Sequence, residues 1–134
     1  MTLEEAKARH PGAEPCTFGD GGALTEEINR LVREGAKTAT CALAAAFGDA
    51  PLPKSGDRWI LLTPEGAPVQ VIETVEVRRL TFDTMTEALV PEQGEFADLE
   101  DWRRGYRAYL TWQGQFAPNA PMVWEKFRRV EVLG

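Results

Sequence analysis

The sequence predicts an α+β fold with a mostly antiparallel sheet, and three observations lead to this expectation. Helical and strand-like segments both occur, but they do not alternate in the regular way that builds a parallel sheet. Two strand-like runs, residues 58–62 and 69–77, flank the turn sequence TPEG and therefore form an antiparallel hairpin. The chain has 134 residues, 43 % of them hydrophobic, and can bury one core without disulfides or structural metals.

The predicted organisation is a single domain over residues 18–134, preceded by an N-terminal extension over residues 1–17. The first helix is expected to begin at Thr25, whose side chain can accept a hydrogen bond from a free N–H of the first turn. Gly35 stands where a left-handed residue commonly ends a helix. The apolar face of this helix is formed by Leu24, Ile28, Leu31 and Val32.

An Ala-rich run, residues 41–48, follows the segment GAKTAT of residues 35–40. We expect this run to form a short helix that is capped by Thr40 and ended by Gly48. Lys37 and Thr40 would then lie beside free backbone N–H groups, a place that attracts anions. The alternative is a helix cap followed by a surface lysine, with no pocket.

Glu73 interrupts an apolar stripe in the second strand of the hairpin. Because side chains alternate between the two faces of a strand, Glu73 is expected on the face of Val69, Val71, Val75 and Val77. A buried, unpaired carboxylate is costly. Glu73 is therefore expected to contact a pocket, to face water at a barrel mouth or sheet edge, or to pair with an arginine.

The last third of the chain predicts two helices and a strand. Residues 83–90 are expected to form a short helix closed by Pro91, and residues 98–110 a stronger helix capped by Asp98. Residues 123–133 return to the alternation of a strand. The apolar face of the stronger helix contains Tyr106, which is either a core residue or the rim of a pocket.

The composition limits the possible partners. A net charge of −6 disfavours tight binding of duplex DNA, although six basic residues of the C-terminal third form a candidate patch or a solvated face. They are Arg103, Arg104, Arg107, Lys126, Arg128 and Arg129. The two cysteines and the single histidine show no metal-site spacing, so neither a metal nor another cofactor is expected. No apolar run is long enough to span a membrane, and we expect a cytoplasmic protein without membrane partners.

Several segments occur together in a fixed order. They are FGD (18–20), GAKTAT (35–40), LPKSGD (52–57), GAPVQVIET (66–74), a loop containing Gly94 and Glu95, DLEDWRRGYRAYL (98–110) and VWEKFRRVEV (123–132). As a set they resemble an ASCH domain of the YhfF-like group in the PUA-like superfamily. The resemblance covers about residues 18–132, and its specificity lies in the order of the segments rather than in any one of them.

The resemblance implies a PUA-like β-barrel flanked by helices, with a cleft beside the G-x-K-x-x-T segment, and it implies RNA as a ligand. One branch of the family hydrolyses the acetamide of N4-acetylcytidine with a Lys-x-x-Thr pair and a later glutamate. Lys37 and Thr40 match the pair, and Glu95 matches the acid. The chain departs from the pattern at Gln93 and Ala97, where acidic residues are common, and at Tyr106, where a histidine is expected.

Two functions follow from these features, and a regulatory domain that binds a partner is a third alternative. The first is a binding module for RNA or a nucleoside-like small molecule, since single bases are held by aromatic stacking and by hydrogen bonds to their edges. The aromatic candidates are Trp59, Trp102, Tyr106, Trp112 and Trp124, and most of them are expected in the core. The expected ligand contacts are Lys37, Thr38, Thr40, Glu73 and Tyr106.

The second function is an amidohydrolase for an N-acylated nucleobase, with N4-acetylcytidine as the type substrate. Thr40 would be the nucleophile, Lys37 the base if burial lowered its pKa, and Glu95 the group that protonates or orients the leaving amine. Backbone N–H groups at the start of the expected Ala-rich helix would hold the oxyanion. A pocket lysine is expected to contribute little to packing, so that Lys37→Ala should cost little stability.

Overall fold

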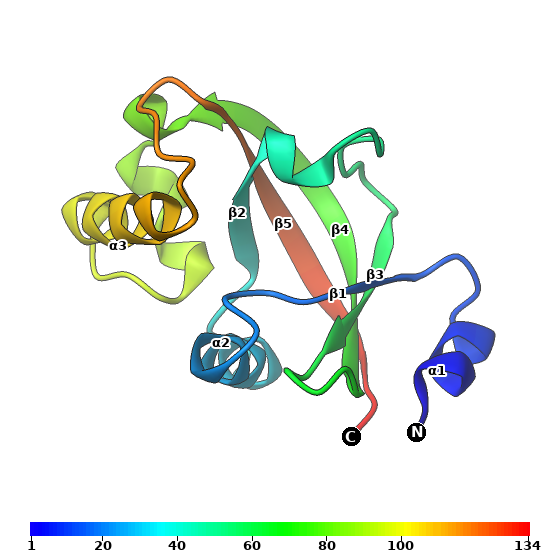
Figure 1. The fold of residues 1–134 in the computed structure, drawn as a ribbon. Helices are drawn as coiled ribbons and strands as arrows, with labels where there is room; N and C mark the ends of the chain where they lie inside the picture. The colour runs from blue at the N-terminus through cyan, green and yellow to red at the C-terminus, as the bar shows by residue number, and fades with distance from the viewer.

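The computed structural model describes residues 1–134 as one sheet with helices around it (Figure 1). The strands are β1 (Glu14–Cys16), β2 (Ala39–Leu43), β3 (Arg58–Leu62), β4 (Pro68–Thr81) and β5 (Pro121–Val132). The α-helices are α1 (Leu3–Arg9), α2 (Ala23–Glu34) and α3 (Leu99–Trp112). Four 3₁₀ turns complete the chain: η1 (Ala44–Phe47), η2 (Phe82–Thr84), η3 (Glu87–Leu89) and η4 (Pro91–Gln93).

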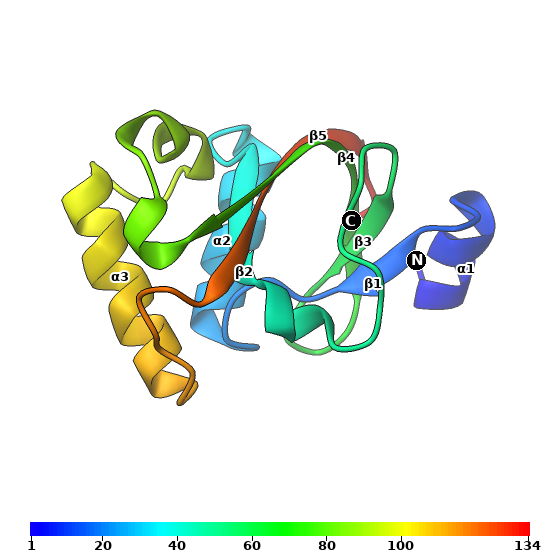
Figure 2. The ribbon, with the colours of Figure 1, turned by 90° about the horizontal axis from the view of Figure 1, so that it is seen from above.

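The sheet has the strand order β1-β3-β4-β5-β2. The β1–β3 pair is parallel, and the other three pairs are antiparallel. The predicted α+β class with a mostly antiparallel sheet is therefore confirmed. The expected barrel is not confirmed, because β1 and β2 are the two edges of the sheet and do not pair with each other (Figure 2).

The hairpin of β3 and β4 forms as predicted, but the expected stripe on β4 is wrong. Two irregularities in the pairing of β4 with β5, at Val71/Ile72 and Thr74/Glu76, break the simple alternation of faces. Val71 and Ile72 are consequently both buried, whereas Val75 is 38 % exposed. Glu73 thus does not interrupt a continuous apolar face.

Two of the helices confirm the periodicity in the sequence, although one cap differs. Helix α2 begins after Gly22 rather than at Thr25, whose hydroxyl instead accepts a hydrogen bond from the Gly21 N–H at 2.8 Å. Gly35 ends α2 in the left-handed conformation, with φ of 84°. Asp98 caps α3 by accepting a hydrogen bond from the Asp101 N–H.

The helix expected over residues 41–48 is wrong. The segment Ala39–Leu43 forms β2, whose residues alternate between buried and half-buried, and only Ala44–Phe47 form a single 3₁₀ turn. A run this short is a marginal helix even when it is rich in alanine, and five pairs with β5 decide its conformation. No helix N-terminus therefore lies behind Thr40.

The helix expected over residues 83–90 is also wrong, because this stretch forms η2 and η3 instead. Phe82, Met85 and Val90 are buried in the cluster that packs under α3. Separate short turns place these three side chains in the same cluster. The residues therefore form two 3₁₀ turns in place of one continuous helix.

Each α-helix covers its own group of core residues. Trp102 and Leu110 of α3 belong to the largest cluster, and Ile28 and Val32 of α2 to a second one. The third cluster joins Ala6 of α1 and Ala13 with strands β3 and β4. Residues 1–17, expected to be an extension, thus supply both a strand and part of the core. None of the helices combines the length and the apolar character that crossing a membrane demands.

The loop after η4 approaches the segment between α2 and β2 very closely. The Thr38 N–H donates to the Glu92 carbonyl oxygen at 2.7 Å. Gly94 has a φ of 71°, and a Cβ atom added to it would lie only 2.4 Å from the Ala36 carbonyl oxygen. Only glycine fits here without displacing backbone.

We expect Gly94→Ala to destabilise the protein by more than about 2 kcal/mol, because it adds a backbone collision to the cost of a left-handed alanine. Gly114→Ala is the matched control, since Gly114 has a φ of 73° and no atom within 4 Å of its added Cβ. Urea denaturation of both variants measures the difference. Equal losses of stability would show that the close approach of Gly94 to Ala36 has no energetic weight.

Candidate functional site

A cavity of about 560 Å³ lies between α3, β2 and the segment that joins β1 to α2. Fourteen of its 21 lining residues are hydrophobic. They come from parts of the chain that are far apart in sequence: Cys16 at the end of β1, Thr40 and Cys41 of β2, Tyr106 of α3 and Glu125 of β5. The cavity is the place where the two edges of the sheet and α3 meet.

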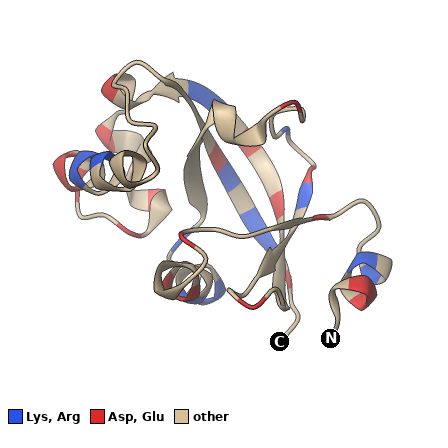
Figure 3. Cartoon of the chain, in the orientation of Figure 1, with Lys and Arg blue, Asp and Glu red and all other residues tan.

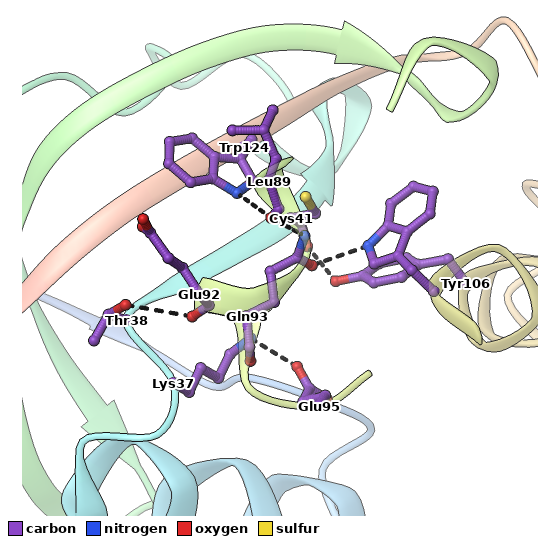
Figure 4. Close-up of polar contacts among 10 residues, drawn as sticks. Lys37, Thr38, Cys41, Leu89, Glu92, Gln93, Glu95, Tyr106 and Trp124 are labelled. Atoms are coloured by element: carbon purple, nitrogen blue, oxygen red, sulfur yellow. Dashed lines mark hydrogen bonds and ion pairs between the residues drawn. The ribbon is translucent and has the colours of Figure 1, made fainter. Parts of the chain in front are cut away.

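Lys37 and Glu95 form a buried ion pair next to this cavity (Figure 4). The Lys37 Nζ donates to Glu95 Oε2 at 2.6 Å and to the Gln93 carbonyl oxygen at 3.1 Å. The Lys37 side chain is 0 % exposed, and that of Glu95 is 15 % exposed. Burial lowers the pKa of Lys37, and the charge of Glu95 opposes this effect. Glu95 lines the cavity, whereas Lys37 does not and instead borders a separate polar hollow.

Gln93 is a structural residue of the loop. Its side-chain oxygen accepts a hydrogen bond from Trp102 Nε1 at 2.9 Å, and its amide nitrogen donates to the Leu89 carbonyl oxygen at 2.9 Å. The residue is fully buried. An acidic side chain at this position would place a charge in the core, so Gln93 fits the neutral, hydrogen-bonded environment that surrounds it.

Thr40 lines the cavity from the edge strand β2. It pairs with Glu125 of β5, so both side chains lie on the same face of the sheet. The next residue, Cys41, accepts a hydrogen bond at its carbonyl oxygen from the Tyr106 hydroxyl at 3.1 Å. In a strand the N–H and C=O of one residue point to the same side, so the Cys41 amide also points away from β5. Burial raises the pKa of the Cys41 thiol to about 12, which keeps it protonated.

Tyr106 is both packed against the core and part of the cavity wall, the two alternatives that the sequence left open. Its ring stacks on Trp102 with centroids 4.8 Å apart and contacts Phe96 at 5.7 Å. It also lines the cavity. Burial raises the pKa of Tyr106 well above its usual value, so the phenol stays neutral and its hydroxyl holds β2 against α3.

Glu125 is a cavity residue that sequence reasoning missed. It is 7 % exposed, and its Oε1 accepts hydrogen bonds from Trp59 Nε1 at 3.0 Å and from the Thr74 hydroxyl. Burial raises the pKa of Glu125, and the hydrogen bonds from Thr74 and Trp59 oppose this effect. The signal that could have found it is the argument applied to Glu73, since Glu125 shares a strand face with Val123 and Phe127.

Two expected ligand contacts lie outside the cavity. Glu73 forms ion pairs with Arg58 at 3.0 Å and Arg128 at 3.2 Å, and these pairs lower its pKa. Thr38 lies in a separate polar hollow beside Glu92 and the basic residues of β5. The structure therefore brings Thr40, Glu95 and Tyr106 to one cavity, and Lys37 contacts this group only through Glu95. Thr38 lies with Lys37 in the separate polar hollow, and Glu73 lies apart from both.

The aromatic and basic candidates are also divided by the fold. Trp59 lines the cavity, Trp102 and Trp124 are buried in the core, and Trp112 is 68 % exposed. The basic residues of α3 and those of β5 lie on different elements, as Figure 3 shows, and do not form one patch. No lysine or arginine lines the cavity. No group of three or more His, Cys, Asp or Glu side chains is placed to hold a metal ion.

Comparisons with known proteins agree on one family. The sequence model of the ASCH domain matches residues 14–131. The fold is similar to that of protein EF3133 from Enterococcus faecalis V583, with 25 % identity, a TM-score of 0.78, and coverage of 96 % of this chain and 85 % of that one. An ASCH domain from Lactobacillus crispatus JV V101 has 19 % identity, a TM-score of 0.77, and coverage of 96 % and 86 %. A mutant ASCH protein from Zymomonas mobilis has 12 % identity, a TM-score of 0.54, and coverage of 81 % and 70 %. No curated protein matches this chain.

The burial of Lys37 reverses the expectation that Lys37→Ala costs little stability. Removing the ammonium leaves the Glu95 carboxylate without its partner beside the core, and we expect a loss of about 3–5 kcal/mol in the free energy of unfolding. Lys126→Ala is the control, because Lys126 pairs with Glu92 at 3.5 Å while 41 % exposed. That variant should lose less than about 1 kcal/mol. Urea denaturation at pH 7 measures both, and similar small losses would contradict a buried pair.

Proposed function

Because this chain belongs to the ASCH domain family, we propose that its cavity binds a nucleoside-like small molecule or a single unstacked base of an RNA. The observation that carries the proposal is the lining of the cavity, which is mostly apolar and carries a few polar groups that converge from different strands. A volume of about 560 Å³ lies in the range of small-molecule sites. A compact, flat ligand such as a nucleobase would therefore fit between the aromatic side chains that line the cavity.

Aromatic side chains supply the stacking surfaces. Phe18, Trp59, Tyr106 and Tyr109 all line the cavity. Stacking of a base on an aromatic ring contributes about 1–3 kcal/mol in single-strand binding proteins. The lining contains no cation, so a phosphate group gains nothing inside it. The base and sugar of a ligand therefore occupy the cavity, and any phosphate stays outside.

We expect free nucleosides to bind and to change the tryptophan fluorescence through Trp59. Titration with cytidine, adenosine, guanosine and uridine at two salt concentrations tests this, and the affinity should depend little on salt because no phosphate is held. Ala42→Phe, which fills the cavity from β2, should weaken binding more than tenfold. Ala50→Phe is the control, since Ala50 is exposed outside the cavity.

Two results would contradict the binding proposal. One is the absence of any fluorescence or melting-temperature change with all four nucleosides and with short single-stranded RNA. The other is binding that Ala42→Phe leaves intact, because the ligand would then occupy a different surface.

A second candidate function is hydrolysis of an N-acylated nucleobase such as N4-acetylcytidine. The observation that favours it is the placement of Thr40 and Glu95 in one cavity, with the Lys37 ammonium held on Glu95 at 2.6 Å. The lowered pKa of Lys37 increases the fraction of its side chain that is a neutral amine, the form that can accept a proton, relative to an exposed lysine. These three residues are the set that the family resemblance implies for this chemistry.

The reaction would require the neutral amine form of Lys37. It would begin with attack of the Thr40 oxygen on the acetyl carbonyl carbon, while the Thr40 proton passes by way of Glu95 to that amine. The C–N bond then breaks, and Glu95 orients the leaving amine as it takes a proton from Lys37. Water hydrolyses the acetyl-threonine ester, which releases acetate and restores Thr40. The oxyanion would be held by the Cys41 amide at the free edge of β2, because no helix begins behind Thr40.

We expect N4-acetylcytidine to yield cytidine and acetate, measured by chromatography, and Thr40→Val to abolish this turnover while the variant stays folded. Thr38→Val is the matched control, because Thr38 lies outside the cavity with its hydroxyl near the Glu92 carbonyl oxygen. The absence of product at high protein concentration would remove the hydrolase function. It would leave the binding proposal standing.

A further inference from the structure

Resting on the proposed function, we infer that Glu125 selects the ligand by an exocyclic amine, so that the cavity prefers cytosine-type and adenine-type bases over analogues without the amino group. Glu125 lies in β5 opposite Thr40, inside the same cavity that the nucleoside would fill. None of the sequence features pointed to this residue. The argument depends on how its two carboxylate oxygens are used.

The first oxygen is fully occupied by the protein. Glu125 Oε1 accepts hydrogen bonds from Trp59 Nε1 at 3.0 Å and from the Thr74 hydroxyl, which is itself fully buried. The indole N–H is a donor only, and it is shared between Glu125 Oε1 and the Thr74 hydroxyl oxygen, each at 3.0 Å. The two donors therefore fix the orientation of the carboxylate.

The second oxygen is left for a ligand. None of the protein's hydrogen bonds or ion pairs involves Glu125 Oε2. The atom is also not among the fully buried side-chain atoms that lack a hydrogen-bond partner, which are Asn29 Oδ1, Gln70 Oε1 and Glu92 Oε2. Since the residue is only 7 % exposed and lines the cavity, the accessible part of Oε2 faces the cavity interior.

The two carboxylates of the cavity, those of Glu95 and Glu125, differ in whether the protein already supplies a cationic partner. Glu95 already contacts the Lys37 ammonium at 2.6 Å. Glu125 forms no ion pair, and no lysine or arginine lines the cavity near it. A carboxylate without a cation gains most from an N–H donor of the ligand, and a site built for a donor rejects an analogue that lacks it.

The experiment compares matched nucleosides that differ only in the amine. They are cytidine against the riboside of pyrimidin-2-one, and adenosine against the riboside of unsubstituted purine. Isothermal titration of the wild-type protein should show at least tenfold weaker binding of each analogue without the amine. This comparison needs no variant and therefore does not depend on the folding of one.

Glu125→Gln sharpens the test, because an amide that keeps its oxygen toward the two donors, the Trp59 N–H and the Thr74 hydroxyl, retains both hydrogen bonds. Its NH₂ group then faces the cavity and presents a donor where the wild-type protein presents an acceptor. We expect the preference for the amine to disappear or to reverse in this variant. Glu131→Gln is the control: Glu131 lies on the same strand and pairs with Arg9 outside the cavity, and the wild-type preference should remain.

The outcomes separate the two proposals. If neither member of either pair binds, both this inference and the nucleoside proposal are overturned. If all four nucleosides bind with equal affinity, or Glu125→Gln keeps the wild-type preference, only the role of Glu125 is overturned. Binding of a simple alkylammonium ion as tight as that of cytidine also overturns it, because charge rather than an aminated base would then be recognised.

Discussion

The buried contact of Lys37 with Glu95 and with the Gln93 carbonyl oxygen is the constraint on which the site depends. It holds the loop after η4 against the segment that leads into β2, where Gly94 allows the two backbones to meet. Gln93 then hydrogen-bonds Trp102, and Trp102 stacks on Tyr106. Tyr106 in turn binds the Cys41 carbonyl oxygen. A continuous set of contacts thus runs from one ammonium group through α3 and back to the strand that carries Thr40.

This arrangement gives the cavity two acids of different character. Glu95 is neutralised by Lys37, whose charge is held out of reach of solvent. Glu125 is held only by the neutral donors Trp59 and Thr74, and burial raises its pKa. One acid is therefore suited to chemistry that involves the lysine, and the other to recognition. The division explains why a single cavity supports both a binding and a hydrolytic proposal without requiring the same residue twice.

The spacing of apolar residues in the sequence predicted the longer helices and strands correctly. Helices α2 and α3, the β3–β4 hairpin and the strand β5 all appear where expected. The helix predicted for the Ala-rich run after Thr40 does not form, because pairing with β5 outweighs a weak local helix preference. The predicted strand face of Glu73 is wrong because bulges shift the register, and a bulge cannot be recognised from one sequence. Lys37, Thr40 and Glu95 came from the family resemblance, which carries no information about burial. The position of Thr40 and Glu95 in one cavity, and the complete burial of the Lys37 side chain outside that cavity, needed the folded chain.

The open sheet gives the cavity its position. Cys16, the last residue of β1, and Thr40 to Leu43 of β2 line the same space, so the hollow lies along the seam where closure of the sheet would have paired these two edges. In a closed structure that seam would be filled by a ladder of backbone hydrogen bonds. In this structure β1 and β2 do not pair, and residues of both strands line the cavity instead. A ligand that contacted both strands would therefore join the two ends of the sheet, so its binding would stiffen the sheet as well as fill the cavity.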